Sequence, residues 1–142
     1  MAKTNILIVD DEQDIRESLK DILEDEGHNI FLAENAKVAS VIKDKESIEL
    51  ILLDIWMPDC DGITLLKQWS RANKINCPVL MMSGHGTIDT AIEATKIGAY
   101  NFLEKPISLQ KLLNAINSAL KKEIHVTKID QNFINTSQLN WV

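Results

Sequence analysis

The sequence predicts an α/β fold: a doubly wound, five-stranded parallel sheet with five helices. Short apolar runs alternate five times with segments whose apolar residues recur at helical spacing. Glycine or proline marks several of the junctions between them. Strands that alternate with helices over short linkers form parallel sheets, with right-handed crossovers and helices on both faces. The chain of 142 residues is long enough to bury the core of one such domain.

The first half of the chain contains three predicted strands. Residues 5–9 (NILIV) are continuously apolar, as a strand covered on both faces requires, and residues 28–33 and 48–54 are the next two candidates. Gly27 stands where the helix between the first two strands would end. Two helices are indicated by apolar residues at helical spacing: Ile15, Leu19, Ile22 and Leu23; then, more weakly, Ala36, Val38, Ala39 and Ile42.

The second half repeats the pattern after a turn at residues 58–62. Two further strands are predicted at residues 79–82 and 100–103; Gly98 closes the helix between them, and Pro106 ends the last strand. Three helices are indicated by their apolar residues: Ile63, Leu65, Leu66 and Trp69; Ile88, Ala91 and Ile92; Leu109, Leu112, Leu113, Ile116 and Leu120. The pattern is then lost, which predicts one domain over residues 1–121 and a linker or C-terminal tail over residues 122–142.

Composition excludes several classes of function. The formal charge of −6 argues against direct nucleic-acid binding by this domain, because phosphate backbones attract basic patches. No apolar run approaches the roughly 20 residues of a membrane span, and the N-terminus lacks the layout of a secretory signal. Cys60 and Cys77 form no metal-binding pattern. We therefore expect a cytoplasmic protein with reduced thiols.

Charged and polar residues stand at the carboxyl ends of four predicted strands. They are Asp10, Asp11 and Glu12 after the first strand, Asp54 at the end of the third, Ser83 after the fourth and Lys105 after the fifth. In open parallel sheets, sites form at the carboxyl ends of the strands, near the point where the strand order reverses. If these four strands are neighbours, the residues converge on one pocket.

A cluster of carboxylates such as Asp10, Asp11 and Asp54 needs a cation. Two carboxylates about 4 Å apart repel each other by about 4 kcal/mol at a protein-like dielectric. Oxygen donors in an open geometry suit Mg²⁺, which needs only one or two carboxylates and keeps several waters. Lys105 supplies a second, fixed positive charge. The sequence therefore predicts a magnesium site at these strand ends.

A metal ion, a lysine and a hydroxyl together suit phosphoryl transfer, because they neutralise the charge on the equatorial oxygens. Asp54, alone at the end of a central strand, is the candidate nucleophile that would form an acyl phosphate. Each signal also has an ordinary structural interpretation, since acidic residues often begin helices and a serine before glycine is common in turns. Because all of these signals fall at the ends of predicted strands in one fold, the functional interpretation is favoured over the structural ones.

Three other polar residues are given structural interpretations. His85, between two glycines, is expected to be a loop residue facing solvent rather than a catalytic base. Asp59 and Asp61 are expected to be solvated turn residues. They are not predicted to bind calcium, because no glutamate stands at the twelfth position of an EF-hand loop counted from either of them.

Four segments, ILIVDDE, LILLDIWMPDCDG, LMMSGHG and GAYNFLEKP, resemble in order and spacing the receiver domain of two-component response regulators. The resemblance covers about residues 4–121 and implies the CheY-like (flavodoxin-like) fold with strand order 2-1-3-4-5. It implies that Asp54 is the phosphoacceptor and that Asp10, Asp11 and the Trp56 backbone carbonyl join it in binding Mg²⁺. Asp11 would be the more direct ligand of the acidic pair.

The resemblance also assigns the remaining site residues. Ser83 matches the hydroxyl residue that contacts the phosphoryl group, and Lys105 matches the family's lysine, in a cis peptide bond with Pro106. Ser83 and Phe102 would form the switch: Ser83 moves toward the phosphoryl group, and Phe102 turns inward. Many relatives have tyrosine at the position of Phe102, so the hydroxyl of that residue is lost here. The surface formed by the fourth helix, fifth strand and fifth helix would then change its affinity for partners, a homodimer among them.

Positions two residues beyond the phosphoacceptor and beyond the serine tune the lifetime of the signal in relatives; here they are Trp56 and His85. We hypothesise that the bulky Trp56 shields the acyl phosphate from water and lengthens its life. The stretch from Ser83 to Pro106 looks most like receivers of the NtrC and NtrX group. Those receivers precede an AAA+ ATPase and a DNA-binding domain, and no such domain follows within the 142 residues.

Three functions compete on this sequence. The first is a signalling switch, not an enzyme in the usual sense, that takes a phosphoryl group from a sensor histidine kinase and controls an output such as transcription. The second is a haloacid-dehalogenase-type phosphatase, which would need an aspartate two residues after Asp54, where Trp56 stands. The third is a receiver-like docking module that works without phosphorylation; its usual mark is the loss of pocket residues, and none is lost here.

Overall fold

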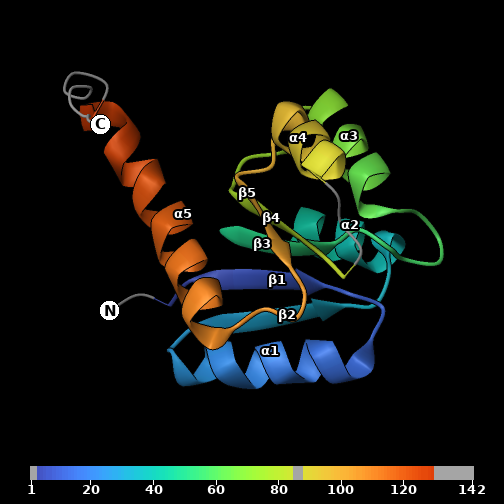
Figure 1. Ribbon diagram of the computed structural model, residues 1–142, viewed down its shortest axis with the longest axis horizontal. Helices are drawn as coiled ribbons and strands as arrows, with labels where there is room; N and C mark the ends of the chain where they lie inside the picture. Colours follow the sequence, from blue (N-terminus) through green and yellow to red (C-terminus); the bar gives the residue numbers. More distant parts are fainter. Residues whose placement is uncertain (1–2, 85–87, 130–142) are drawn as a thin grey trace.

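The computed structural model describes residues 3–84 and 88–129 (Figure 1). Five parallel strands form one sheet in the order β2-β1-β3-β4-β5, which confirms the predicted fold class and strand order. The strands are β1 (Asn5–Val9), β2 (Asn29–Ala33), β3 (Leu50–Asp54), β4 (Val79–Ser83) and β5 (Asn101–Glu104). Each lies within two residues of its predicted bounds.

Five helices cover the two faces of the sheet. They are α1 (Gln13–Asp25), α2 (Ala36–Lys45), α3 (Gly62–Arg71), α4 (Ile88–Ile97) and α5 (Leu109–Ile129). Helices α1 and α5 pack on one face, while α2, α3 and α4 pack on the other (Figure 1). Among the described residues, no helix is long and apolar enough to cross a membrane.

The continuous apolar character of the central strands follows from this two-sided burial. In β1, Leu7 and Val9 belong to the core under α2, α3 and α4, whereas Ile6 and Ile8 belong to the core under α1 and α5. All four are fully buried. Successive side chains of a strand point to opposite faces, so a strand between two helical layers has no face for polar residues.

Local signals explain where two of the helices end. Gly27 follows α1 with a φ of +93°, and Gly98 follows α4 with a φ of +134°, both in the region that glycine enters without a steric penalty. Helix α5 differs from the expectation, because it continues to Ile129, eight residues past position 121. Residues 122–129 contain neither glycine nor proline, so nothing in the sequence stops the helix. The domain boundary at residue 121 stays a prediction.

Candidate functional site

The buried polar residues of the described chain lie at the carboxyl edge of the sheet. Asp10 follows β1, Asp54 ends β3 and Ser83 ends β4, and these are the buried polar or charged residues of the described chain. Parallel strands in the order β1-β3-β4-β5 bring their carboxyl ends to one edge, which places the three residues side by side. Lys105 reaches the same edge from the end of β5. The convergence expected from the sequence is therefore present.

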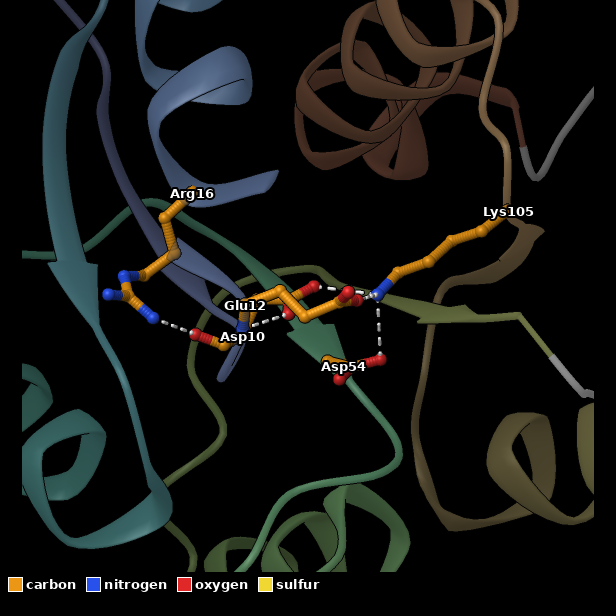
Figure 2. Close-up of polar contacts among 5 residues, drawn as sticks. All are labelled: Asp10, Glu12, Arg16, Asp54 and Lys105. Atoms are coloured by element: carbon orange, nitrogen blue, oxygen red, sulfur yellow. Dashed lines mark hydrogen bonds and ion pairs between the residues drawn. The ribbon is translucent and has the colours of Figure 1, made fainter. Parts of the chain in front are cut away.

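The Lys105 ammonium lies between the carboxylates (Figure 2). Its Nζ is 2.7 Å from Asp10 Oδ2 and 3.2 Å from Asp54 Oδ1, with Glu12 Oε1 farther away at 3.6 Å. The lysine side chain is only 15% exposed, and the Lys105 backbone N–H donates to the Ser83 carbonyl at 2.8 Å. The peptide bond between Lys105 and Pro106 is cis, as the resemblance implied. The lysine is thus a fixed cation.

Asp10 is held at each of its backbone and side-chain polar groups. Its N–H donates to the Ala33 carbonyl at 3.1 Å, and its carbonyl accepts a hydrogen bond from Arg16 Nη1 at 2.7 Å. Its carboxylate accepts from the Glu12 N–H at 2.9 Å through Oδ1 and from Lys105 through Oδ2 (Figure 2). Sequence reasoning missed Arg16, because its role depends on a half-buried side chain reaching back from the first turns of α1 to the strand end.

Burial raises the pKa of Asp54 to about 6, and the negative charge of Asp10 adds to this effect while Lys105 opposes it. Burial alone would lower the pKa of Lys105, but its hydrogen bond to Asp10 and the charges of both carboxylates outweigh burial and raise it. The cluster therefore carries more negative charge than one lysine balances. A second cation at this edge would favour the ionised form of Asp54.

A divalent metal ion fits this donor set. Asp10, Asp11 and Asp54 each offer one carboxylate oxygen, and the three oxygens lie within 4.8 Å of one another. Asp11 is exposed, so the cluster opens to solvent on one side and leaves room for the waters that Mg²⁺ retains. Hard oxygen donors with an open side favour Mg²⁺ over metals that prefer imidazole or thiolate ligands.

The loop between β3 and α3, residues 55–61, folds back against the phosphoacceptor candidate. The Gly62 N–H donates to the Ile55 carbonyl at 2.6 Å, and a Cβ on Gly62 would overlap the Asp54 carbonyl oxygen. Glycine is required here because α3 starts directly against the backbone of Asp54. Within this loop the Trp56 side chain is 56% exposed.

Asp59 and Asp61 lie in the turn before α3, as expected, and Asp59 is exposed, but each also accepts hydrogen bonds from the start of a helix. Asp61 caps α3, its Oδ1 accepting from the Thr64 N–H at 2.8 Å. Asp59 accepts hydrogen bonds from two backbone amides at the start of α2, across 22 and 23 residues of sequence. The capping role of Asp61 has a local sequence signal, an aspartate before a helix, whereas the contact of Asp59 has none.

Phe102, one of the two predicted switch residues, lies in β5. It is half-buried, packs against the core under α2, α3 and α4, and pairs in register with Met81 of β4. It also lines a depression of about 670 Å³ formed by residues of α4, β5 and α5. Ser83 is fully buried two residues farther along β4 from Met81. His85 lies outside the described residues.

A parallel α/β fold with a lysine held between buried carboxylates at the carboxyl edge defines a phosphoacceptor class of signalling protein rather than a classical enzyme. Residues 6–117 match the response regulator receiver domain family, and the chain belongs to it. This family membership favours the signalling switch over the phosphatase alternative.

Relatives and solved structures agree with this assignment. The chain is 39% identical over 137 residues to an NtrX-like response regulator of Rickettsia bellii, covering 95% of this chain and 28% of that protein. It is 43% identical over 119 residues to the nitrogen assimilation regulatory protein NtrX of Azorhizobium caulinodans, covering 82% and 26%. NtrX from Brucella abortus, crystallised with ADP, has a TM-score of 0.80 at 36% identity and covers 96% of this chain and 32% of its own.

The beryllofluoride-activated receiver domain dimer of NtrC4 also matches, with a TM-score of 0.76 and 40% identity over 83% of this chain and 97% of that one. These likenesses confirm the expected resemblance to the NtrC and NtrX group. The chain spans about a quarter of the length of the NtrX relatives that it matches.

Proposed function

We propose that Asp54 accepts a phosphoryl group from the phosphohistidine of a sensor kinase. The observation that carries this proposal is the Lys105 ammonium, fixed 3.2 Å from Asp54 Oδ1 and 2.7 Å from Asp10 at the solvent-facing edge of the sheet. An Asp54 carboxylate oxygen attacks phosphorus, the P–N bond breaks, and its electron pair returns to the imidazole, which takes up a proton. The product is an acyl phosphate on Asp54.

The pocket residues supply the charge that this transfer requires. Lys105 faces the phosphoryl oxygens from one side, and the Ser83 hydroxyl contacts them at the end of β4. Asp10, Asp11, Asp54 and the Trp56 carbonyl would hold Mg²⁺, which would supply positive charge to neutralise the same oxygens. Water then hydrolyses the acyl phosphate and restores the Asp54 carboxylate. The pKa of about 6 keeps Asp54 mostly ionised at neutral pH, as a nucleophile must be.

The kinase needs a surface beside this pocket. An open groove of about 510 Å³ lies next to Lys105, with apolar walls from Ile15, Leu19 and Ile22 of α1 and Ile107 after β5. Glu12 and Asp14 rim it. The phosphodonor must approach Asp54 from the open edge, so we place the segment of the kinase that carries the phosphohistidine in this groove.

Phosphorylation is proposed to act on the face formed by α4, β5 and α5. Ser83 moves toward the phosphoryl group, Phe102 turns into the space that opens, and the depression that Phe102 lines changes shape. A homodimer through this face is one outcome; the beryllofluoride-activated NtrC4 receiver domain is itself a dimer. The NtrX relatives are longer than this chain. In line with the resemblance to the NtrC and NtrX group, the domain acts in the cytoplasm and controls an AAA+ and DNA-binding output on the same polypeptide. Residues 122–142 then serve as a linker or C-terminal tail, the first part of which continues helix α5 to Ile129.

Mass spectrometry after incubation with acetyl phosphate and Mg²⁺ tests the proposal. We expect a shift of one phosphoryl group that is absent from Asp54→Ala and present in the matched control Asp21→Ala, which removes an exposed aspartate of α1. Phosphorylation that persists in Asp54→Ala would assign the acceptor elsewhere. A wild-type chain that takes no phosphoryl group would favour the docking module instead.

A further inference from the structure

The middle of the loop between β3 and α3 is tied to helix α2 by the carboxylate of Asp59. Its Oδ1 accepts a hydrogen bond from the Ala36 N–H at 3.1 Å, and its Oδ2 accepts one from the Lys37 N–H at 3.2 Å. Ala36 and Lys37 are the first two residues of α2, so their amides have no acceptor within the helix. One carboxylate therefore satisfies two helix amides from a distant loop.

The charge of Asp59 strengthens this contact. The start of a helix carries a partial positive charge, and hydrogen bonds from an ionised acceptor are stronger than those from a neutral one. The Ala36 amide is the largest cause that holds the pKa of Asp59 below its usual value; burial opposes it, and the amides of Lys37, Asp59 and Cys60 add to the lowering. Asp59 is exposed, yet it stays ionised and bound to α2 at neutral pH.

Two further bonds fix the ends of the same loop. The Ile55 N–H donates to the Met82 carbonyl of β4 at 3.0 Å, and the Gly62 N–H donates to the Ile55 carbonyl. Residues 56–58 thus run between a tie to the sheet at Ile55 and a tie to α2 at Asp59. Pro58 restricts this short segment further, because its ring fixes φ. The segment contains Trp56, whose carbonyl is proposed to bind the metal ion.

We propose that Asp59 is a positioning residue for the phosphorylation site. By clamping the loop to α2, it holds the Trp56 backbone carbonyl at the edge where Asp10, Asp11 and Asp54 gather. The inference rests on the proposed function, since it assigns the Trp56 carbonyl to the Mg²⁺ site of the phosphoacceptor. Asp59 itself contacts neither the metal ion nor the phosphoryl group; it acts through the main chain of residues 56–58.

Asn35 offers a matched control at the same helix end. Its Oδ1 accepts a hydrogen bond from the Val38 N–H at 2.9 Å, the third amide of α2, and Asn35 precedes the helix in its own chain segment. Removing the Asn35 side chain weakens the start of α2 without removing the tie between α2 and the loop. Any effect common to both variants therefore reports on the helix, and an effect of Asp59 alone reports on the clamp.

The test compares Asp59→Ala, Asp59→Asn and Asn35→Ala in the full chain by calorimetric Mg²⁺ titration and by amide hydrogen exchange. We expect Asp59→Ala to weaken Mg²⁺ binding about tenfold, the low end of what outer ligand-orienting partners contribute, and to speed exchange at Trp56 and Met57. Asp59→Asn retains one acceptor oxygen and should fall between Asp59→Ala and the wild type. Asn35→Ala should speed exchange at the start of α2 and keep the wild-type Mg²⁺ affinity.

Two results would overturn the inference: exchange in the loop that is the same for Asp59→Ala and Asn35→Ala, or faster loop exchange with unchanged Mg²⁺ affinity. Failure of the proposed function looks different. In that case the wild-type chain takes no phosphoryl group on Asp54, whereas the exchange and Mg²⁺ data still decide whether the clamp exists and whether it shapes the metal site.

Discussion

The two edges of the sheet carry the same residue types in opposite settings. At the carboxyl edge, Lys105 is 2.7 Å from an Asp10 side chain with no exposed surface. At the amino edge, Lys74 lies 3.5 Å from Asp44, and both side chains are about half exposed. Water screens the second pair, whereas the first shares its lysine with Asp54 in a pocket where each charge depends on its neighbours. Burial and sharing, rather than the presence of an ion pair, distinguish a functional edge from a solvated one.

Among the substitutions that test the contrast between the two edges, Lys105→Met is expected to have the largest effect. It removes the fixed cation from two buried carboxylates, so we expect phosphorylation by acetyl phosphate to slow by about a hundredfold. The unfolding free energy should fall by about 3 kcal/mol, because Asp10 loses its charged partner. Phosphotransfer assays and denaturant titrations measure the two effects, with the exposed Lys111→Met as control. Phosphorylation of Lys105→Met at the wild-type rate would contradict the role given to this lysine.

Asp54→Asn is expected to stabilise the metal-free protein at neutral pH. The folded-state pKa of about 6 lies above the ordinary value of 3.8, so the folded protein binds this proton more tightly than the unfolded chain does. The resulting stability is present below about pH 4 and is lost as the pH rises through 6. Asparagine has no carboxyl group to ionise, so the Asp54→Asn variant does not lose this stability. At neutral pH its free energy of unfolding should therefore exceed that of the wild type by about 1 to 3 kcal/mol, once screening by water is included.

Thermal or denaturant unfolding between pH 4 and 8 in the presence of a chelator measures the effect. The wild type should lose stability across this range relative to Asp54→Asn, and added Mg²⁺ should restore part of it. Parallel pH profiles for the two proteins would show that the Asp54 carboxyl is not the group responsible.

Trp56→Ala should change the lifetime of the acyl phosphate at the carboxyl edge without changing the charge there. If the indole shields the acyl phosphate from water, its removal should speed autodephosphorylation several-fold and leave the phosphorylation rate nearly unchanged. Loss of radiolabel or of the phosphoryl mass over time measures the rate. Val41→Ala removes another exposed apolar side chain, on α2, and serves as control. An unchanged lifetime in Trp56→Ala would refute the shielding hypothesis.

Lys74→Met is the smallest expected effect and completes the comparison. The pair with Asp44 is exposed, so we expect the unfolding free energy to change by less than about 0.5 kcal/mol. Phosphorylation and Mg²⁺ affinity should not change. A loss of stability as large as that of Lys105→Met would mean that burial does not separate the two edges.

The sequence predicts most of this fold because its physical signals are local. Continuous apolar runs such as residues 50–53 indicate strands buried on both faces, and strict alternation with helices indicates a parallel sheet. Convergence of Asp10, Asp54 and Lys105 then follows from the geometry of parallel strands. The end of α5 could not be predicted in the same way, because no stop signal marks it.

Contacts that depend on side-chain reach were not predictable. Arg16 bonds the Asp10 carbonyl, and Asp59 bonds amides more than 20 residues away in sequence. Neither contact leaves a periodic pattern or a spacing that a single sequence could display. Both arise only when the packed helices set the distances between the loops and the strand ends. The sequence therefore predicts the charged residues at the centre of the site, but not the residues, such as Arg16 and Asp59, that contact the surrounding backbone.

The C-terminal part of helix α5 projects beyond the core of the domain (Figure 1). Figure 1 shows its last turns extending away from the sheet, while Leu112 to Ala119 anchor its first half in the core. The eight residues past position 121 add about 12 Å of rigid rod. A tilt of roughly 10° at the buried base would therefore move the far end of this extension by about 2 Å relative to its start. Small repacking beneath α5 would thus displace the last turns of the helix.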